Sequence, residues 1–397
     1  MKNFAQAIQV PQEETIIIGQ ATTFEEKREI FRLRYQVYAE EIAYNFVSID
    51  HENRLLYDDF DEKALILYAK IGSKIIGTGR VNIGKLSDFP SDIVQTYRMD
   101  KFKKFYSKDD DPYFAIISKV MILPQYRSSS TMYLIMANLY NLHRDYQVQF
   151  AFINCSFHLI PFYERSGYVR IDKNTVDSND GSSLSSLVLL VDDVQYLKKV
   201  GSLLYRIARQ RTSLNQKVVD WFNSEFSREL DTIVNSQLVT ADKLWSIIYN
   251  YMGGAPNNII PILNDLSMLE SKLFLHSCST IVHCHKGDYI TVEGNTSQEL
   301  ITLLSGKAQS SLDGVILPGQ YCGENGLVNR SRHFSSVIAL EDADFLVLSF
   351  SLFSNFRKRH PNIERKILDN LQQQICYPIR DRMASSTLDC TSITMAQ

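Results

Sequence analysis

Apolar residues in the first half of the chain follow strand and helix periodicities in turn. A β-branched run at 15–21 predicts a strand, and the residues that follow repeat at helical spacing to about Glu41. Thr23 and Glu26 have the spacing of a capping box, which sets the start of that helix. Two further helices are expected, one from Thr131 to about Arg144 and a short one ending at Gly167 as a left-handed cap. Further strands are predicted at 64–70, 75–81, 113–123, 149–155 and 186–191, with a loop at 98–112.

These alternating elements predict an α/β domain over residues 1–195, and the pattern changes after it. Residues 196–259 repeat at helical spacing and are expected to form a helical connector. Its first part carries a basic face that fits either a solvated surface or a membrane- or partner-binding helix, with Arg206, Arg209, Arg211 and Lys217.

Short strands separated by glycines begin at residue 281 and predict a β-roll within a domain of residues 260–380. An amphipathic helix is expected at 351–377, within the same domain. The tail, 381–397, is rich in Ser and Thr and is expected to be disordered.

Composition narrows the class of protein. The 397 residues are 45% apolar and 22% charged, which is ordinary for a globular chain of two or three domains. A net charge of −3 gives no electrostatic footprint for nucleic acid. The sequence shows neither a secretory signal nor a transmembrane run, and its six cysteines are scattered. We therefore expect free thiols and a cytoplasmic location.

One cluster of metal-ligand residue types lies near the start of the predicted β-roll. It consists of His276, Cys278, His283, Cys284 and His285. The spacing matches no common zinc pattern, and in a strand the last two histidines share one face with Cys284 on the other. We expect structural strand residues here and no metal ion.

The strand at 113–123 runs through a short turn into the helix that begins at Thr131. Backbone N–H groups at such a turn and the helix dipole favour an anion, and small residues let it approach the backbone. Arg127 can add a bidentate contact. The turn therefore predicts a site for the phosphates or pantetheine arm of a donor, formed by Arg127, Ser128, Ser129 and Ser130. The alternative is an ordinary capped helix.

These residues resemble the GNAT acyltransferase superfamily. The stretch from Arg127 to Met132 stands where the family has Arg-x-x-Gly-x-Gly/Ala, with Ser and Met in place of both glycines. The stretch from Phe162 to Tyr168 resembles the FYExxGF segment of the family. That resemblance implies that Tyr163 protonates the leaving thiolate; the alternative is a tyrosine that only packs.

A second set of residues narrows the resemblance to acyl-homoserine-lactone synthases and long-chain N-acyl amino acid synthases. The set contains, in order, Arg34, Tyr38, Tyr44, Asp58, Asp61 and Arg80. Leu56 and the stretch Ile116–Lys119 depart from the lactone synthases, which have Glu at the first position and Glu-x-Ser-Arg at the second. The resemblance implies an acyl amide product. It also implies acyl carrier protein as the donor, or acyl-CoA, and an amino acid or small amine as the acceptor.

The chemistry requires a neutral amine that attacks a thioester. Asp58 and Asp61 are predicted to take the amine proton through water, and paired carboxylates are expected to raise each other's pKa. Arg34 and Arg80 are predicted to orient these carboxylates or a substrate carboxylate. The oxyanion donors are expected to be backbone N–H groups near Val120, Met121 and Ile122. The alternative is a purely structural ion-pair network.

Glycines in the last third of the chain resemble those of the cyclic-nucleotide-binding domain over residues 260–377. The resemblance implies that Glu324 binds the ribose 2′-OH and that the loop amides face the cyclic phosphate. The family has an arginine three residues before Ser336, where this chain has His333; Arg332 precedes it and points elsewhere in a regular strand. The implied site comprises Gly323, Glu324, Asn325, Gly326, Leu327, Arg332, His333 and Ser336.

The sequence therefore predicts an N-acyltransferase with a regulatory domain that takes cAMP or cGMP. A protein lysine acetyltransferase that uses acetyl-CoA under cyclic-nucleotide control is the alternative enzyme. The other alternative is a non-catalytic sensor or scaffold, with the β-roll kept for docking or for a homodimer.

Overall fold

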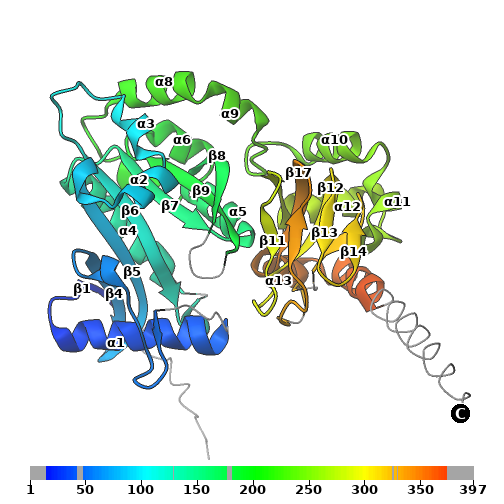
Figure 1. Ribbon diagram of the computed structural model, residues 1–397, viewed down its shortest axis with the longest axis horizontal. Helices are drawn as coiled ribbons and strands as arrows, with labels where there is room; N and C mark the ends of the chain where they lie inside the picture. The colour runs from blue at the N-terminus through cyan, green and yellow to red at the C-terminus, as the bar shows by residue number, and fades with distance from the viewer. Residues whose placement is uncertain are drawn as a thin grey trace, which may run out of the picture. The chain divides into compact units, whose positions relative to one another are not determined.

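The computed structural model describes residues 15–42, 48–127, 129–176, 181–323, 326–328 and 330–372 (Figure 1). The chain forms two compact units. Unit 1 contains residues 1–153, 188–198 and 202–221, and unit 2 contains 154–187, 199–201 and 222–397. The predicted tail, 381–397, lies outside the described residues. Among the helices that are described, none combines the length and apolar character needed to cross a membrane.

A seven-stranded mixed sheet confirms the α/β prediction. Its order is β1-β4-β5-β6-β7-β9-β8, antiparallel from β1 to β6 and parallel between β6 and β7. The strands are β1 (Ile16–Gln20), β4 (Leu65–Ile71), β5 (Lys74–Lys85), β6 (Tyr113–Ile122), β7 (Phe150–Cys155), β8 (Val169–Val176) and β9 (Ser183–Leu190). The sequence pattern missed β8, because its charged and polar residues hide the alternation of a strand.

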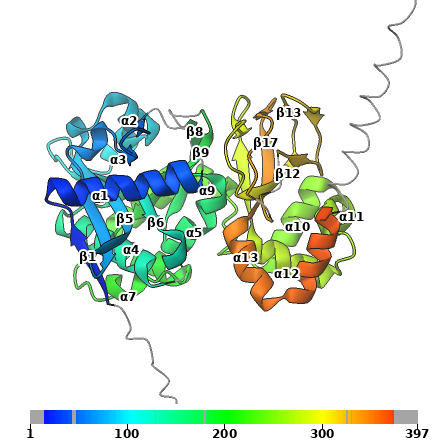
Figure 2. The same ribbon diagram turned by 90° about the horizontal axis from the view of Figure 1, so that it is seen from below.

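The first helix, α1 (Phe24–Tyr35), begins at Thr23 with the predicted capping box. It continues as a π-helical turn, η1 (Gln36–Glu41), so the predicted helix is confirmed in two segments. Helix α1 packs against β5, and Figure 2 shows it running across the sheet. The small hairpin β2 (Ile49–Asp50) and β3 (Leu55–Leu56) follows and leads into η2 (Asp59–Asp61).

Helix α4 (Thr131–Asp145) lies unusually close to strand β5. A Cβ atom added at Gly77 or Gly79 would lie 3.1 Å or 3.0 Å from the side chain of Ile135 on this helix. Because glycine has no Cβ, the helix backbone can approach the strand. The turn η4 (Pro124–Tyr126) joins β6 to this helix.

Two sequence expectations were wrong in unit 1. Within the stretch predicted as a loop lies α3 (Met99–Lys103), because Phe102 is fully buried among aromatic rings. The predicted continuous basic helix is broken into α7 (Tyr205–Ala208) and α8 (Gln216–Glu225). Asp192 holds the intervening chain: it pairs with Arg211 and accepts from the N–H of Asn215 at 2.9 Å. Arg211 therefore does not belong to a solvated basic face.

The remaining helices are short. In and around unit 1 they are α2 (Ser91–Thr96), α6 (Val194–Lys199) and the turn η3 (Leu86–Asp88). Those of unit 2 are η5 (Phe157–Leu159), α5 (Ile160–Ser166), α9 (Ser227–Thr232), α10 (Ala241–Met252), α11 (Pro256–Ile259), η6 (Pro261–Leu263) and α12 (Met268–Cys278). Helix α5 ends at Gly167 in the left-handed conformation, as predicted.

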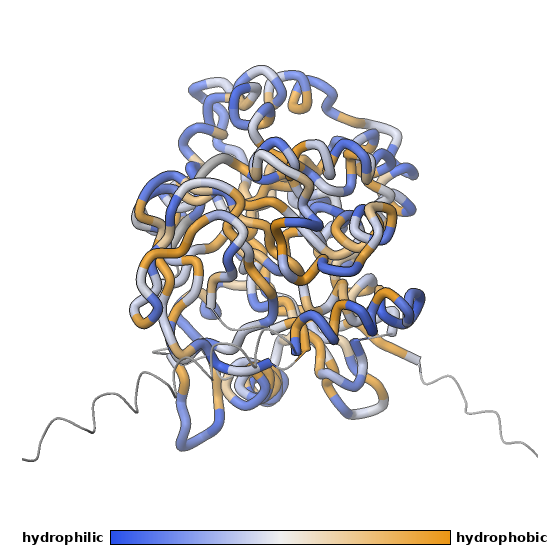
Figure 3. The backbone as a smooth tube through the Cα atoms, turned by 90° about the vertical axis from the view of Figure 1, so that its right-hand side faces the viewer, coloured by the Kyte–Doolittle hydropathy of each residue, from blue (hydrophilic) through white to orange (hydrophobic). Residues whose placement is uncertain are grey.

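Two four-stranded antiparallel sheets confirm the predicted β-roll. One contains β10 (Ser279–Cys284), β17 (Ala343–Ser349), β12 (Glu299–Ser305) and β15 (Tyr321–Cys322). The other contains β11 (Tyr289–Thr291), β16 (Val337–Ala339), β13 (Ala308–Ser310) and β14 (Gly314–Ile316). Apolar and hydrophilic stretches alternate along the backbone that faces the viewer in Figure 3. The helix predicted at 351–377 ends early, as α13 (Phe350–Arg359), because Pro361 follows; residues 361–372 form a further helical segment.

Within unit 2, the segment α5–β8 is tied to the β-roll by a buried arginine. The Arg170 guanidinium donates to Glu164 Oε1 at 2.7 Å, to the Ile281 carbonyl of β10 at 2.7 Å and to the Val234 carbonyl at 2.5 Å. His158 Nδ1 lies 2.9 Å from Glu299 Oε2 on β12. Residues 154–187 therefore belong to the same compact unit as the roll.

Candidate functional site

Four predicted residues of unit 1 meet in one cluster: Arg34 on α1, Asp58 and Asp61 around η2, and Arg80 on β5. The Asp-x-x-Asp spacing forms a reciprocal capping box. The Asp58 carboxylate accepts from the N–H of Phe60 at 3.1 Å, and that of Asp61 accepts from the N–H of Asp58 at 3.0 Å. Local backbone bonds therefore fix both carboxylates before any long-range partner contributes.

Arg34 and Asp61 form the buried floor of the cluster. Arg34 is fully buried, and its Nη1 donates to both Asp61 oxygens at 2.8 Å. Burial lowers the pKa of Arg34. Burial alone would raise the pKa of Asp61, but the charges of Arg34 and Arg80 outweigh it and hold this pKa below its ordinary value. The expectation that paired carboxylates raise each other's pKa is therefore wrong for Asp61, because guanidinium groups lie beside it.

Asp58 is the carboxylate that solvent reaches: its side chain is 29% exposed, against 6% for Asp61. Its Oδ1 pairs with Arg80 Nη1, and its Oδ2 lies 3.9 Å from Lys119 Nζ. Arg80 also donates through Nε to the Ser118 hydroxyl at 2.8 Å, which fixes the plane of the guanidinium. Asp58 thus sits between two cations at the accessible side of the cluster.

Lys119 occupies a bulge in strand β6 and has a left-handed backbone, with φ of 52°. The register between β5 and β6 shifts there, since Thr78 faces Met121 while Arg80 faces Ser118. The ammonium lies 5.1 Å from the ring centroid of Tyr38, a residue of the predicted motif. Ser118 and Lys119 were missed as site residues. The available signal was that they stand where the related enzymes have Ser-Arg.

Strand β6 separates from β7 just before this bulge. Within the described residues the two strands pair only at Ala115–Ala151 and Ile116–Phe152. The backbone at Val120, Met121 and Ile122 is therefore paired through β5 on one side and not through β7 on the other. This arrangement suits oxyanion donors, and their role stays a prediction.

The turn after β6 uses most of its polar groups internally. Arg127 donates to the two Glu41 oxygens at 2.6 Å and 2.5 Å and to the Ile122 carbonyl at 3.1 Å. The Ser129 hydroxyl donates to the Tyr126 carbonyl at 2.6 Å and accepts from the N–H of Thr131 at 3.2 Å. Ser130 is the N-cap of α4 and makes no side-chain cap bond, while Ser128 and Tyr44 lie outside the described residues. Donor binding at this turn stays a prediction.

Tyr163 lies on α5 in unit 2 and is 6% exposed. Its ring packs edge-on against Phe162 and Tyr168, with centroids 5.0 Å and 5.6 Å away. Packing of this kind fits the alternative role, and the role of general acid stays a prediction.

Two glycines of the predicted nucleotide loop, Gly323 and Gly326, pack closely on neighbouring residues of the β-roll. Gly323 has φ of 70°, and a Cβ added there would lie 2.7 Å from His333 Nδ1. His333 is buried, and its backbone pairs with Gly294 and Asn295. Gly326 packs equally closely on Ser297, where an added Cβ would lie 2.4 Å from the hydroxyl. Leu327 is fully buried, and Glu324 and Asn325 lie outside the described residues.

The residues predicted to hold the cyclic phosphate differ in their exposure to solvent. Arg332 is exposed and its backbone bridges to Thr296, whereas His333 is buried, which agrees with the alternation expected of a strand. The Ser336 hydroxyl accepts from the N–H of Glu293 at 3.0 Å. The loop thus brings together Gly323 and His333 and leaves Arg332 on the surface.

Comparisons with known proteins match each half of the chain separately. Residues 29–189 match the family model of the N-acyl amino acid synthase FeeM, and residues 281–360 match that of the cyclic nucleotide-binding domain. No curated protein matches the chain significantly.

Solved structures similar to this chain cover one half or the other. FeeM, an N-acyl amino acid synthase from uncultured soil microbes, is 14% identical over 49% of this chain and 98% of that chain, with a TM-score of 0.36. BjaI, a CoA-dependent acyl-homoserine lactone synthase, is 16% identical over 50% of this chain and 92% of that chain, with a TM-score of 0.35. A cyclic nucleotide-binding domain from Methylobacillus flagellatus is 21% identical over 40% of this chain and 89% of that chain, with a TM-score of 0.31.

The two family models confirm the interpretation of the sequence in its main features. Residues 29–189 are similar to N-acyl amino acid synthases, and residues 281–360 are similar to cyclic nucleotide-binding domains.

Proposed function

We propose that the protein transfers a fatty acyl group from a thioester to the amine of an amino acid or small amine. The thioester is carried by acyl carrier protein or by CoA. The observation that supports this most directly is Asp58, a partly exposed carboxylate held between Arg80 and Lys119 beside the bulge of β6. The match to the N-acyl amino acid synthase model supports the reaction class.

The reaction forms a C–N bond and breaks the C–S bond of the thioester. The attacking ammonium must first lose a proton, and Asp58 accepts it directly or through water because solvent reaches this carboxylate. Asp61 stays ionised as the counter-ion that positions Arg34 and Arg80. After the C–N bond forms, the nitrogen loses its second proton to solvent as the C–S bond breaks. The leaving thiolate takes up a proton, with Tyr163 as the candidate donor, and solvent returns a proton to this tyrosine.

Charge favours an acceptor that carries its own carboxylate. The cluster contains three cationic side chains, Arg34, Arg80 and Lys119, and two carboxylates, Asp58 and Asp61. Lys119 lies beside Asp58, the carboxylate that solvent reaches, and a substrate carboxylate can approach the cluster on this side. An amino acid therefore fits the cluster better than a simple amine does.

Thiol release tests this function. Purified protein is given acyl carrier protein loaded with chains of several lengths, the matching acyl-CoAs and acetyl-CoA, with an amino acid or its decarboxylated amine as acceptor. Asp58→Asn should lower kcat/KM by about 10²- to 10⁴-fold, the usual contribution of a general base. Asp59→Asn is the matched control, because Asp59 is an exposed carboxylate on the same turn.

Equal rates for the two variants would contradict the role of Asp58. A preference for acetyl-CoA with a protein lysine as acceptor would favour the protein acetyltransferase. No release with any donor would favour a non-catalytic sensor or scaffold.

We also propose that the β-roll regulates the enzyme by binding a cyclic nucleotide. The match of residues 281–360 to the cyclic nucleotide-binding domain model supports this. Millimolar cAMP or cGMP should raise the thermal midpoint, because binding to the folded state stabilises it. A flat response to both nucleotides, together with a concentration-dependent dimer in sedimentation, would instead assign the roll to docking or dimerisation.

A further inference from the structure

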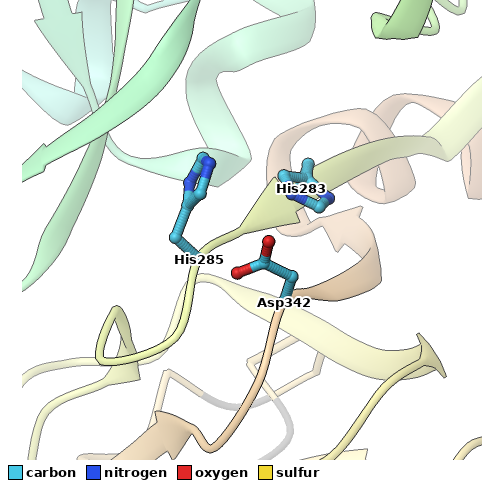
Figure 4. A group of neighbouring side chains, drawn as sticks. All are labelled: His283, His285 and Asp342. Carbon is cyan, nitrogen blue, oxygen red and sulfur yellow. The ribbon is translucent and has the colours of Figure 1, made fainter.

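We propose that His283, His285 and Asp342 bind a divalent transition-metal ion at the edge of the β-roll. One potential ligand atom from each residue lies within 4.8 Å of the others. Figure 4 shows the Asp342 carboxylate between the two imidazole rings. The ring centroids of the two histidines are 5.0 Å apart.

Strand geometry explains why these three residues meet. His283 and His285 are separated by one residue at the end of β10, so both point to one face, while Cys284 is buried on the other. Strand β17 pairs antiparallel with β10, with His283 opposite Asp344 and Cys284 opposite Ala343. The same register continued by one residue places Asp342 opposite His285.

Neighbouring groups orient each ligand before any ion binds. His283 Nδ1 lies 3.0 Å from Asp344 Oδ1, and the Ser305 hydroxyl donates to the other oxygen of Asp344 at 2.7 Å. In the tautomer that carries its proton on Nδ1, the carboxylate accepts that proton and Nε2 has the lone pair that a metal needs, an arrangement common around metal-binding histidines. The Asp342 carboxylate accepts from the N–H of Lys286 at 3.1 Å. The N–H of His285 itself donates to Asp288 at 3.0 Å, which fixes the turn.

The donor set identifies the class of metal ion. Two imidazoles and one carboxylate suit Zn²⁺, Co²⁺ or Ni²⁺, whereas Ca²⁺ and Mg²⁺ prefer sites made entirely of oxygen. Three protein ligands leave coordination positions for water. His283 and Asp342 are exposed, so an ion can enter directly from solvent. A bound ion would link the end of β10 to the turn between β16 and β17 and so stabilise the roll.

Metal titration of the full-length protein, free of any histidine tag, tests the site. Calorimetry with Zn²⁺ should give one site per chain, and Co²⁺ should give visible absorption typical of nitrogen and oxygen ligands. Zn²⁺ should also raise the thermal midpoint, since it binds only the folded arrangement. His285→Ala and Asp342→Asn should abolish binding, and Asp344→Asn should weaken it by about 10- to 100-fold.

Glu341→Gln is the matched control, because this exposed carboxylate adjoins Asp342 but is not part of the cluster. It should bind the metal as the unchanged protein does. Absence of a wild-type site, or equal binding by the His285→Ala and Asp342→Asn variants, would overturn the proposal. Asp342→Asn alters only an exposed turn, and thermal unfolding without metal confirms that the variant is folded.

Discussion

The charge cluster around Asp58 and the loop around Gly323 are built in opposite ways. The cluster contains buried hydrogen-bond donors that pair with no other described group. Among the described residues, Nε and Nη2 of the buried Arg34 have no hydrogen-bond partner. In the loop, a buried histidine ring rests on glycine, and the Ser336 hydroxyl bonds the backbone. Buried charge that exceeds structural need indicates chemistry, whereas internally satisfied polar groups indicate a role in shape.

Among the changes proposed here, removal of Arg34 should lower the free energy of unfolding the most. Arg34→Met leaves Asp61 buried with a single guanidinium partner, and loss of one member of a buried pair typically costs about 3–5 kcal/mol of unfolding free energy. Urea unfolding measures the change. Arg32→Met, an exposed position on the same helix, should cost little. A small loss at Arg34 would mean that the cluster does not support the fold.

Gly323→Ala tests how much the close packing of the loop contributes to the free energy of unfolding. The added methyl group would meet the His333 ring in a backbone conformation that disfavours side chains, so a loss of about 1–3 kcal/mol is expected. His333→Ala in the same chain should recover part of that loss, because the clash is then removed. The double-mutant cycle is read by thermal unfolding, and strict additivity would show that the ring does not fill the loop.

Lys119→Met tests the binding of the acceptor in the charge cluster, whereas the two variants above test the stability of the fold. If the ammonium attracts the acceptor carboxylate, the variant should raise KM for an amino acid by about tenfold, roughly 1.4 kcal/mol of binding free energy. KM for the decarboxylated amine should not change. Steady-state thiol release measures both values, and equal changes for the two acceptors would contradict a carboxylate-specific role.

The smallest effect is expected for the dependence of stability on pH in the acid range. Because the pKa of Asp61 is lower in the folded state, its ionised form contributes stability that is fully present above the unfolded value, near about 3.9. That contribution is lost as pH falls through the folded pKa. Asp61→Asn should therefore flatten the decline of urea stability in acid, while Asp59→Asn should leave the slope unchanged. A parallel decline in Asp61→Asn would contradict this account.

The sequence predicted the features that depend on local spacing and on family motifs. The capping box of α1, the strands β4 and β5 and four residues of the charge cluster, Arg34, Asp58, Asp61 and Arg80, were found in this way. It missed Lys119, because the left-handed bulge that presents this residue results from the register between β5 and β6. It also missed the broken connector helix, since Asp192 is the distant partner that captures Arg211. Asp342 was missed for the same reason, because strand register alone places it beside His285.

The buried Arg170 makes the β-roll and the segment α5–β8 thermodynamically inseparable. Each of its hydrogen-bond acceptors comes from a different stretch of unit 2, and burial raises the pKa of its partner Glu164, with the charge of Arg170 offsetting part of the rise. Cutting the chain after residue 259 would remove the Ile281 carbonyl and open this site to water. The helix that carries Tyr163 should consequently exchange its amide hydrogens at the same rate as β10, in one cooperative opening.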